Sequence, residues 1–372
     1  MGQGMKIPPG HFGLPGLALN VLHCNEMTNR RIVLASRPAG EPVEGNFRLE
    51  TEELAPPADG ELLLKTKYLS LDPYMRGRMS DGPSYAAPVE VDAPMTGGSV
   101  CEVLESRATE FAAGDMVQAF TGWQEYSVVS PKGLRKLDAA LFSAIGAPVS
   151  TALGILGMPG MTAYTGLLNI GQPKPGETVV VAAASGAVGS AVGQIAKIKG
   201  CRAVGIAGGA AKCSYVVKEL GFDACVDHHS PTLPADLKAA CPGGIDVYFE
   251  NVGGKVFEAV LPLMNEFARV PVCGLISQYN MVELPEGRDR TSLVMRGILT
   301  KRITFRGFIV SDYATQAGEC FREMSGWLRE GRLKYREDVV DGLENAPGAF
   351  IGLLQGRNFG KLLIRFQGLS GA

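Results

Sequence analysis

The sequence contains few of the residues that build metal centres. Only four of its 372 residues are histidines, and no two of its eight cysteines have C-x-x-C spacing, which argues against a zinc knuckle. Between residues 30 and 150 there is one cysteine, Cys101, and no histidine. A catalytic zinc held by cysteine and histidine lacks its ligands there. We therefore predict that the protein uses no metal.

Other absences narrow the functional class. The formal net charge of −2 gives no basic surface for nucleic acid or anionic lipid. No apolar run reaches the roughly 18 residues that a membrane span needs. No G-x-S-x-G motif accompanies the histidines, so hydrolysis has no support. Several cysteines stand in apolar runs such as "DACVD", which predicts buried thiols in a reducing, cytoplasmic compartment.

Chain length and composition predict two domains, because 372 residues with 46% hydrophobic content exceed one ordinary core. Residues 1–26 mix glycine and proline without a period, and we interpret them as a disordered extension or a misassigned start, with Met27 opening the first domain. We expect residues 27–150 to form that first domain and residues 151–340 to form the second. Residues 341–372 are expected to return to the first domain.

The pattern of apolar residues changes near residue 146. Before it, short strand-like runs such as "GELLLKTKYLSLD" and "GGSVCEVLES" alternate with glycine and proline turns, which is typical of a β-rich domain. After it, strand and helix patterns alternate, with helices expected over 190–199, 211–220 and 256–264. Such alternation predicts an α/β fold with a doubly wound parallel sheet. A last strand is expected in "FGKLLIRFQ".

Glycines follow the first strand of the second domain at a fixed spacing. In "VVVAAASGAVGSAVG" the pattern is Ala183-x-x-Gly186-x-x-Gly189, at the point where a strand gives way to a helix. Missing side chains let a backbone approach a pyrophosphate, and the helix N-terminus offers free N–H groups. The spacing predicts a dinucleotide site, although a glycine turn that only packs helix on sheet has the same pattern.

The expected second strand selects between the two nicotinamide dinucleotides. An NAD site carries an acidic residue about 20 residues after the glycines. Here residues 206–213 read "IAGGAAKC", with no acid and with Lys212 instead. A lysine attracts a 2′-phosphate, so the sequence favours NADPH/NADP over NAD. A solvated lysine in a helix's first turn is the alternative.

Several separated motifs resemble one enzyme family. The stretches "YLSLDPYMRGRMSD", "ILGMPGMTAYTGLL", "AAASGAVGSAVGQIAKIKGC", "YFENVGGKVF", "VCGLISQYN" and "RNFGK" are similar to those of the zinc-free medium-chain dehydrogenase/reductases. The resemblance is to the leukotriene/prostaglandin, alkenal and bacterial NADPH-dependent curcumin reductases. It implies a GroES-like catalytic domain, a Rossmann domain, a homodimer joined near "ITFRGFIV", and NADPH-dependent reduction of the C=C bond of α,β-unsaturated ketones or aldehydes.

The resemblance also assigns cofactor-binding residues. His228 stands where relatives commonly have tyrosine; a histidine at that place would bind the adenosine phosphate better when protonated. The implied cofactor contacts are Ala187, Val188, Gly189 and Ser190 at the pyrophosphate, Lys212 at the 2′-phosphate, His228 at the adenosine phosphate end, and Asn251, Cys273, Gly274, Leu275, Ile276, Ser277, Phe308, Ile309, Val310 and Asn358 near the remainder.

Reduction of an enone needs a hydrogen-bond donor near the carbonyl oxygen and a proton for the α-carbon. A tyrosine stays protonated at neutral pH without adjustment. Tyr279, expected to end the strand that passes the nicotinamide, is the first candidate, and Tyr74 is the second. Tyr279 could instead hold only the cofactor ribose, and Tyr74 could be only part of the pocket wall. A quinone oxidoreductase and a non-catalytic NADPH-binding protein are the alternative functions.

Overall fold

The computed structural model describes Met1 and residues 27–283 and 290–366. The predicted extension at residues 1–26 lies outside the described residues apart from Met1. No helix of the described chain is both long and apolar enough to cross a membrane.

A six-stranded parallel sheet organises the second half of the chain. Its strand order is β10-β9-β8-β11-β12-β13, so the chain starts in the middle, winds to one edge, and then returns to wind to the other. This order confirms the predicted doubly wound Rossmann sheet. The strands are β8 Thr178–Ala182, β9 Arg202–Ala207, β10 Ala224–Asp227, β11 Ile245–Phe249, β12 Met264–Val272 and β13 Thr304–Gly307.

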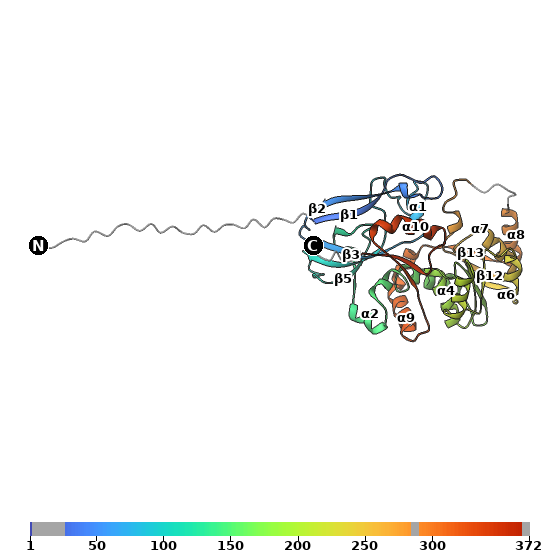
Figure 1. Ribbon diagram of the computed structural model, residues 1–372. Coiled ribbons are helices and arrows are strands. Elements are labelled where there is room, and N and C mark those ends of the chain that lie inside the picture. The colour runs from blue at the N-terminus through green and yellow to red at the C-terminus, as the bar shows by residue number, and fades with distance from the viewer. Residues whose placement is uncertain (2–26, 284–289, 367–372) are drawn as a thin grey trace.

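Helices connect these strands and cover the sheet (Figure 1). They are α4 Ala187–Ile198, α5 Ala210–Lys218, α6 Leu233–Ala240, α7 Gly254–Val260 and α8 Thr291–Lys301. The helix expected from 190 begins three residues earlier, and the one expected over 256–264 ends at Val260. Pro262 lies in the 3₁₀ turn that follows, and Met264 already begins β12, so the prediction was wrong at that end.

The β-rich half contains a seven-stranded sheet and a separate hairpin. The sheet order is β14-β15-β3-β4-β5-β7, with β6 paired to β3, and β1 pairs with β2. The strands are β1 Met27–Leu34, β2 Phe47–Leu54, β3 Leu62–Ser70, β4 Ser99–Ser106, β5 Met116–Ala119, β6 Tyr126–Val129, β7 Arg135–Leu137, β14 Glu337–Asp341 and β15 Lys361–Arg365.

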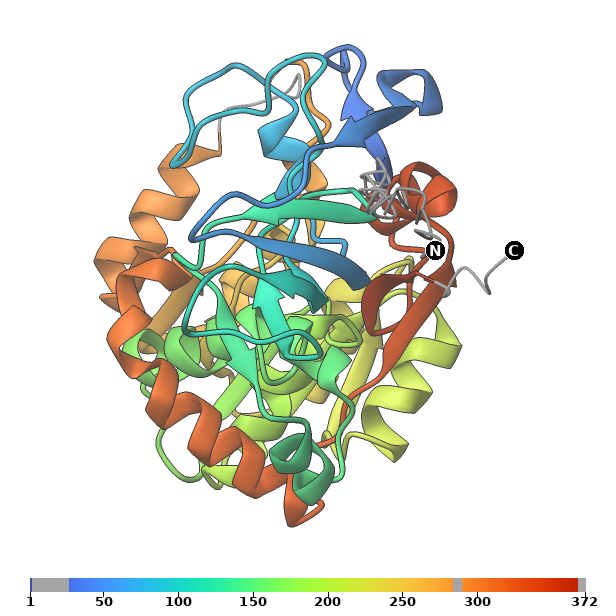
Figure 2. The same ribbon diagram turned by 90° about the vertical axis from the view of Figure 1, so that its left-hand side faces the viewer.

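The C-terminal segment returns to this sheet as predicted. Strand β15 runs antiparallel to β3 and parallel to β14, and the two views show the red segment crossing back to the blue half (Figures 1 and 2). Because β14 begins at Glu337, the return starts just before the predicted boundary at 340, and the domain limits stay predictions. The remaining helices are α1 Met75–Arg78, α2 Ala139–Ile145, α3 Met158–Thr165, α9 Ala317–Arg329 and α10 Ala346–Leu354.

Aromatic packing ties the return segment to the β-rich half. Trp123 stacks on Phe47 with ring centroids 5.6 Å apart, and the ring of Phe350, on α10, meets both at a steep angle. Trp123 and Phe350 are fully buried. Such aromatic pairs contribute about 0.5–1.5 kcal/mol each beyond the area they bury. This cluster fixes α10, and hence the loop that follows it, against the domain that carries Tyr74.

Candidate cofactor and substrate site

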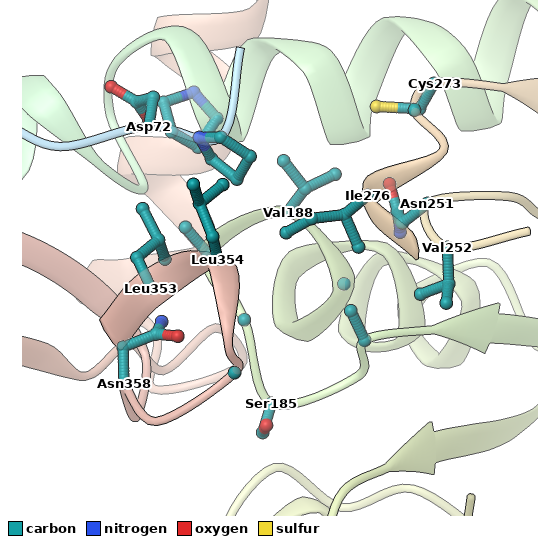
Figure 3. Close-up of a pocket in the computed structure, with 18 of the residues that line it drawn as sticks. Asp72, Ser185, Val188, Asn251, Val252, Cys273, Ile276, Leu353, Leu354 and Asn358 are labelled. Carbon is teal, nitrogen blue, oxygen red and sulfur yellow. The ribbon is translucent and has the colours of Figure 1, made fainter. Parts of the chain in front are cut away.

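A cavity of about 450 Å³ lies between the two halves of the molecule. It follows the carboxyl ends of β8, β9, β11 and β12, which is where ligands bind in open α/β sheets. Figure 3 shows residues of both halves around it: Asp72 and Leu354 lie on one side, and Val188, Ile276 and Cys273 on the other. The cavity therefore has a Rossmann side and a β-rich side.

The β8–α4 turn presents backbone N–H groups to this cavity. The N-cap residue of α4 is Gly186, which has no side chain to cap the first N–H groups of the helix. Ala187, Val188 and Gly189 of the first turn line the cavity. A Cβ at Gly189 would lie 2.3 Å from the Ala183 carbonyl oxygen, so only glycine permits this close packing of helix on turn. First-turn N–H groups have no partner within the helix, and the turn fits an anionic pyrophosphate.

Ser190, a fourth predicted pyrophosphate contact, does not line the cavity. Its backbone N–H donates to the Gly186 carbonyl 3.0 Å away, as the first regular bond of the helix. Leu275, another predicted cofactor residue, also lies outside the cavity lining, and its side chain packs toward Gly253. Their contacts with a cofactor stay predictions.

The β9–α5 turn lacks an acid where an NAD site would carry one. Strand β9 ends at Ala207, and Lys212 lies in the first turn of α5, at the cavity. Its Nζ donates to the Gly356 carbonyl at 2.7 Å, so the lysine is held on the loop that follows α10. His228 lines the same end of the cavity. This end combines a lysine and an imidazole, which fits a 2′-phosphate.

The other predicted cofactor residues are brought to the same cavity. The Asn251 side-chain amide donates to the Ala182 carbonyl at 2.8 Å, and that of Asn358 donates to the Gly360 carbonyl at 2.9 Å, so both amides are oriented. The ring of Phe308 packs edge-on against Phe249. The remaining predicted residues that line the cavity are Cys273, Gly274, Ile276, Ser277, Ile309 and Val310.

Tyr279 lines the cavity from a different element than expected. Strand β12 ends at Val272, and Tyr279 closes a 3₁₀ turn at Ile276–Gln278, so the prediction that it ends the strand was wrong. The turn folds back on itself, because the Leu275 backbone N–H donates to the Tyr279 hydroxyl oxygen at 3.3 Å. Burial raises the pKa of Tyr279, which keeps the hydroxyl protonated and able to donate.

Tyr74 faces the cavity from the β-rich half, directly before α1. Burial raises the pKa of Tyr74 far above its ordinary value, and the nearby Asp72 carboxylate adds to this. Tyr85, which the sequence analysis did not select, also lines the cavity, and the Arg78 guanidinium lies 4.5 Å from the centre of its ring. Both halves of the molecule thus contribute tyrosines to the cavity lining.

Arg76 connects the two tyrosine-bearing segments. Its Nε donates to Asn280 Oδ1 at 3.0 Å, next to Tyr279, and its Nη2 donates to the Gly40 carbonyl at 2.7 Å. Arg76 is itself buried, two residues after Tyr74. A guanidinium held by several acceptors fixes relative positions well, so this side chain links the segment that carries Tyr74 to the segment that carries Tyr279.

A buried ion pair lies on the β-rich side of the cavity. Lys361 Nζ is 2.7 Å from Asp72 Oδ1 and also donates to the Leu71 carbonyl at 2.9 Å, while the Ser70 hydroxyl donates to the other Asp72 oxygen. The sequence analysis missed both charged residues, although each stands inside a motif it quoted. Gly360, beside Lys361, forms a parallel bridge with Gly186 at the cofactor turn.

The site offers no metal ligands in the described part of the chain. Residues 27–283 and 290–366 contain no group of three or more histidine, cysteine, aspartate or glutamate side chains able to hold a metal ion. Cys101 is buried in the β-rich core, where its neighbours are the hydroxyls of Ser99 and Thr66.

Comparison with known proteins places the chain among oxidoreductases. Residues 30–137 match the family described as the N-terminal domain of oxidoreductase, and residues 187–330 match the family described as zinc-binding dehydrogenase. The second description names zinc, which the described residues do not fit.

Characterised relatives match over nearly the whole chain. The chain is 57% identical to the NADPH-dependent curcumin reductase of Escherichia coli over 91% of its own length and 97% of the relative's. It is 42% identical to the NADP-dependent 2-alkenal reductase of Nicotiana tabacum, over 91% of its own length and 98% of the relative's. The crystal structure of CurA with NADPH from Vibrio vulnificus is 55% identical, covers 91% of this chain and 99% of its own, and superposes with a TM-score of 0.87. The chain belongs to the medium-chain dehydrogenase/reductase superfamily, in the group that includes the curcumin, alkenal and prostaglandin reductases.

Proposed function

We propose that the protein is an NADPH-dependent reductase of the C=C bond in α,β-unsaturated ketones and aldehydes. The observation that carries this proposal is one continuous cavity, which is lined by the N-terminus of α4 and by Tyr279 and Tyr74. It joins an anion-binding turn to protonated donors. The relatives named above carry NADPH-dependent curcumin and alkenal reduction in their names.

The chain's own residues fit the cofactor at each end. The N–H groups of Ala187, Val188 and Gly189 would bind the pyrophosphate, Lys212 would bind the 2′-phosphate, and Asn251 would lie beside the nicotinamide half. A bound NADPH supplies the hydride for the β-carbon of the enone. The β9–α5 turn itself contains no acidic residue to repel the 2′-phosphate, and the Asp227 carboxylate of the neighbouring β10 accepts the backbone N–H groups of Gly209 and His229.

Tyr279 is the donor that we assign to the carbonyl oxygen of the substrate. Its oxygen already accepts the Leu275 N–H, so its proton remains available for the cavity. As negative charge develops on the carbonyl oxygen, a hydrogen bond from a buried hydroxyl becomes stronger than it is in water. Proton delivery to the α-carbon comes either from this hydroxyl or from solvent.

The walls next to these hydroxyls are apolar. Leu353 and Leu354 of α10 and Ile276 line the cavity, and Met158 lines it from α3. Figure 3 shows the two leucines facing Ile276 and Val188 across the space. Such walls exclude water from the reacting atoms and bind the apolar part of a substrate. Curcumin-like and oxo-lipid enones have this combination of one carbonyl and a long apolar body.

The deciding experiment is an acceptor panel. Purified protein is given NADPH with an enone, with a quinone, or with no acceptor, and loss of the reduced nicotinamide absorbance is followed. We expect turnover with the enone, with the saturated ketone as product. Faster turnover with the quinone would instead identify a quinone oxidoreductase, and no turnover with either would identify a non-catalytic NADPH-binding protein. Allylic alcohol as the main product would refute C=C reduction.

We also propose a homodimer formed along β13. This strand is the last of the six-stranded sheet, and its backbone edge has no neighbour among the described residues. Next to it, α8 exposes Leu293, Met295 and Leu299. An open edge beside exposed apolar residues is a surface that another chain can cover. Light scattering on purified protein, with Leu299→Glu as the disrupting variant, tests this.

A cytoplasmic location completes the proposal. Cysteines of the described chain, among them Cys101, Cys241 and Cys320, are free and mostly buried, as is usual in reducing compartments. Fractionation of cells expressing the tagged chain tests it, and recovery outside the cytoplasmic fraction would refute it.

A further inference from the structure

Two adjacent histidines line the cavity at its adenosine end. His228 and His229 follow β10 directly, and their ring centroids are 4.0 Å apart at an interplanar angle of 43°. Both side chains line the cavity together with Gly208 and Lys212. His229 has no role in the sequence analysis, and an imidazole pair in contact beside a lysine is an unusual set of groups for a site that only has to bind a neutral ribose.

The two imidazoles converge on one position. A Cβ placed on Gly208 would lie 2.9 Å from His228 Nε2 and 3.2 Å from His229 Nε2. Because Gly208 has no Cβ, both imidazole nitrogens can approach the backbone of the β9–α5 turn closely. Gly208 stands just after β9, where the ribose 2′ position is recognised in dinucleotide-binding sheets. A phosphate on that position has oxygen acceptors for two imidazole N–H groups and for a lysine.

Burial and neighbouring charges favour the neutral form of His228 when no anion is present. Burial lowers the pKa of His228, and His229 and the Lys255 ammonium of α7 lower it further, while Asp227 acts in the opposite direction. Asp227 is engaged by the backbone, because one of its oxygens accepts the N–H groups of Gly209 and His229. A phosphate dianion in the cavity beside the two rings would favour the charged form of an imidazole.

We propose that His228 and His229 form a proton-linked recognition site for the 2′-phosphate of NADPH, so that selectivity for NADPH over NADH increases as pH falls through the neutral range. This inference rests on the proposed function, because it takes NADPH as the cofactor. Binding of the phosphate takes up a proton onto the pair. The donor from each ring then becomes charged, and a hydrogen bond from a charged donor is stronger than one from a neutral donor.

The test uses binding without an enone. Calorimetry measures 2′,5′-ADP, which carries the 2′-phosphate, and 5′-AMP, which lacks it, at about pH 7 and about pH 8.5, where the phosphate stays mostly dianionic. We expect 2′,5′-ADP to bind about fivefold more tightly at the lower pH, with proton uptake visible as a dependence of the heat on buffer ionisation, and 5′-AMP to bind equally at both. Equal binding of 2′,5′-ADP at both pH values, without proton uptake, would overturn the inference.

Variants assign the effect to the pair. His228→Gln and His229→Gln keep hydrogen-bonding capacity but cannot take up the proton, so each should reduce the pH dependence. Lys212→Ala is the matched control, since it leaves both imidazoles in place: it should weaken 2′,5′-ADP binding at both pH values and keep the pH dependence. Binding of 5′-AMP reports that each variant remains folded. If both histidine variants retain the full pH dependence, the pair is not the site.

The result of the nucleotide-binding experiment can be distinguished from the result of the enzyme assay. Enone reduction tests the proposed reaction, whereas nucleotide binding tests the histidines. A chain that reduces enones but binds 2′,5′-ADP without pH dependence retains the function and loses this inference. A chain that shows the proton-linked binding but reduces no enone loses the proposed reaction and retains the recognition site.

Discussion

The buried ion pair between Lys361 and Asp72 should contribute much more to stability than an exposed pair of the same chemistry. The two side chains are only 5% and 7% exposed, and the charged atoms lie 2.7 Å apart. Lys361→Met keeps the length of the side chain and removes the ammonium. Among the described residues, Asp72 would then keep the Ser70 hydroxyl as its side-chain partner. Breaking a buried pair in this way costs about 3–5 kcal/mol, because a charge remains in a low-dielectric site.

The chain offers a matched control on the same sheet. Lys67, on β3, is 3.3 Å from Glu102, and both side chains are 35% exposed. Exposed pairs contribute about 0–1 kcal/mol, so Lys67→Met should change the free energy of unfolding by less than about 1 kcal/mol. The two substitutions delete the same group from a buried and from a half-exposed pair; Lys361→Met also removes the donor to the Leu71 carbonyl.

Urea unfolding followed by tryptophan fluorescence measures both, since Trp123 is fully buried in this half of the molecule. The double variant Asp72→Asn with Lys361→Met should recover part of the loss, because no unpaired charge remains. A loss in Lys361→Met no larger than that in Lys67→Met would refute the reasoning, and so would a double variant that is less stable than Lys361→Met.

Four further outcomes are expected. Lys212→Ala should raise the KM for NADPH by about 10-fold, at the lower end of the range for a charged hydrogen bond because Nζ already donates to Gly356, and should leave the KM for NADH nearly unchanged. Tyr279→Phe should lower kcat by about 100-fold or less, and an unchanged kcat would remove the residue from catalysis. Burial, with the nearby Glu250, raises the pKa of Cys273 to about 12, so mass spectrometry should find its alkylation much slower than that of an ordinary thiol. Elemental analysis of active protein should find substoichiometric zinc, and chelators should not inhibit; one zinc per chain lost together with activity would contradict this.

Local patterns were enough to predict the Rossmann half. Its strands are short apolar runs between helices. The glycine spacing after β8 is a local pattern that predicts a tight turn packed closely against the following helix. The hairpin strand β2 was missed, because "FRLETEEL" is rich in charge and most of its side chains are exposed or half-buried. An exposed strand has no apolar alternation from which it could be predicted.

The site was predictable only where residues lie in local motifs. Asp72 and Lys361 are 289 positions apart, and their contact exists because β15 returns to β3. Nothing periodic in either segment indicates the other. Tyr279 was assigned to a strand end because an apolar run precedes it; the backbone instead turns at Val272 and uses the hydroxyl to accept a backbone N–H. Long-range pairing and turn geometry both depend on the assembled fold.

The charges around the cavity also bear on which reaction it can support. Among the described residues that line it, Asp72 is the one carboxylate, and Lys361 and Ser70 engage both of its oxygens. The two tyrosines keep their protons because burial raises their pKa values. The substrate end therefore presents neutral donors and no free carboxylate to abstract a proton. An environment of this kind stabilises charge as it develops on an oxygen, which is what hydride addition to an enone requires.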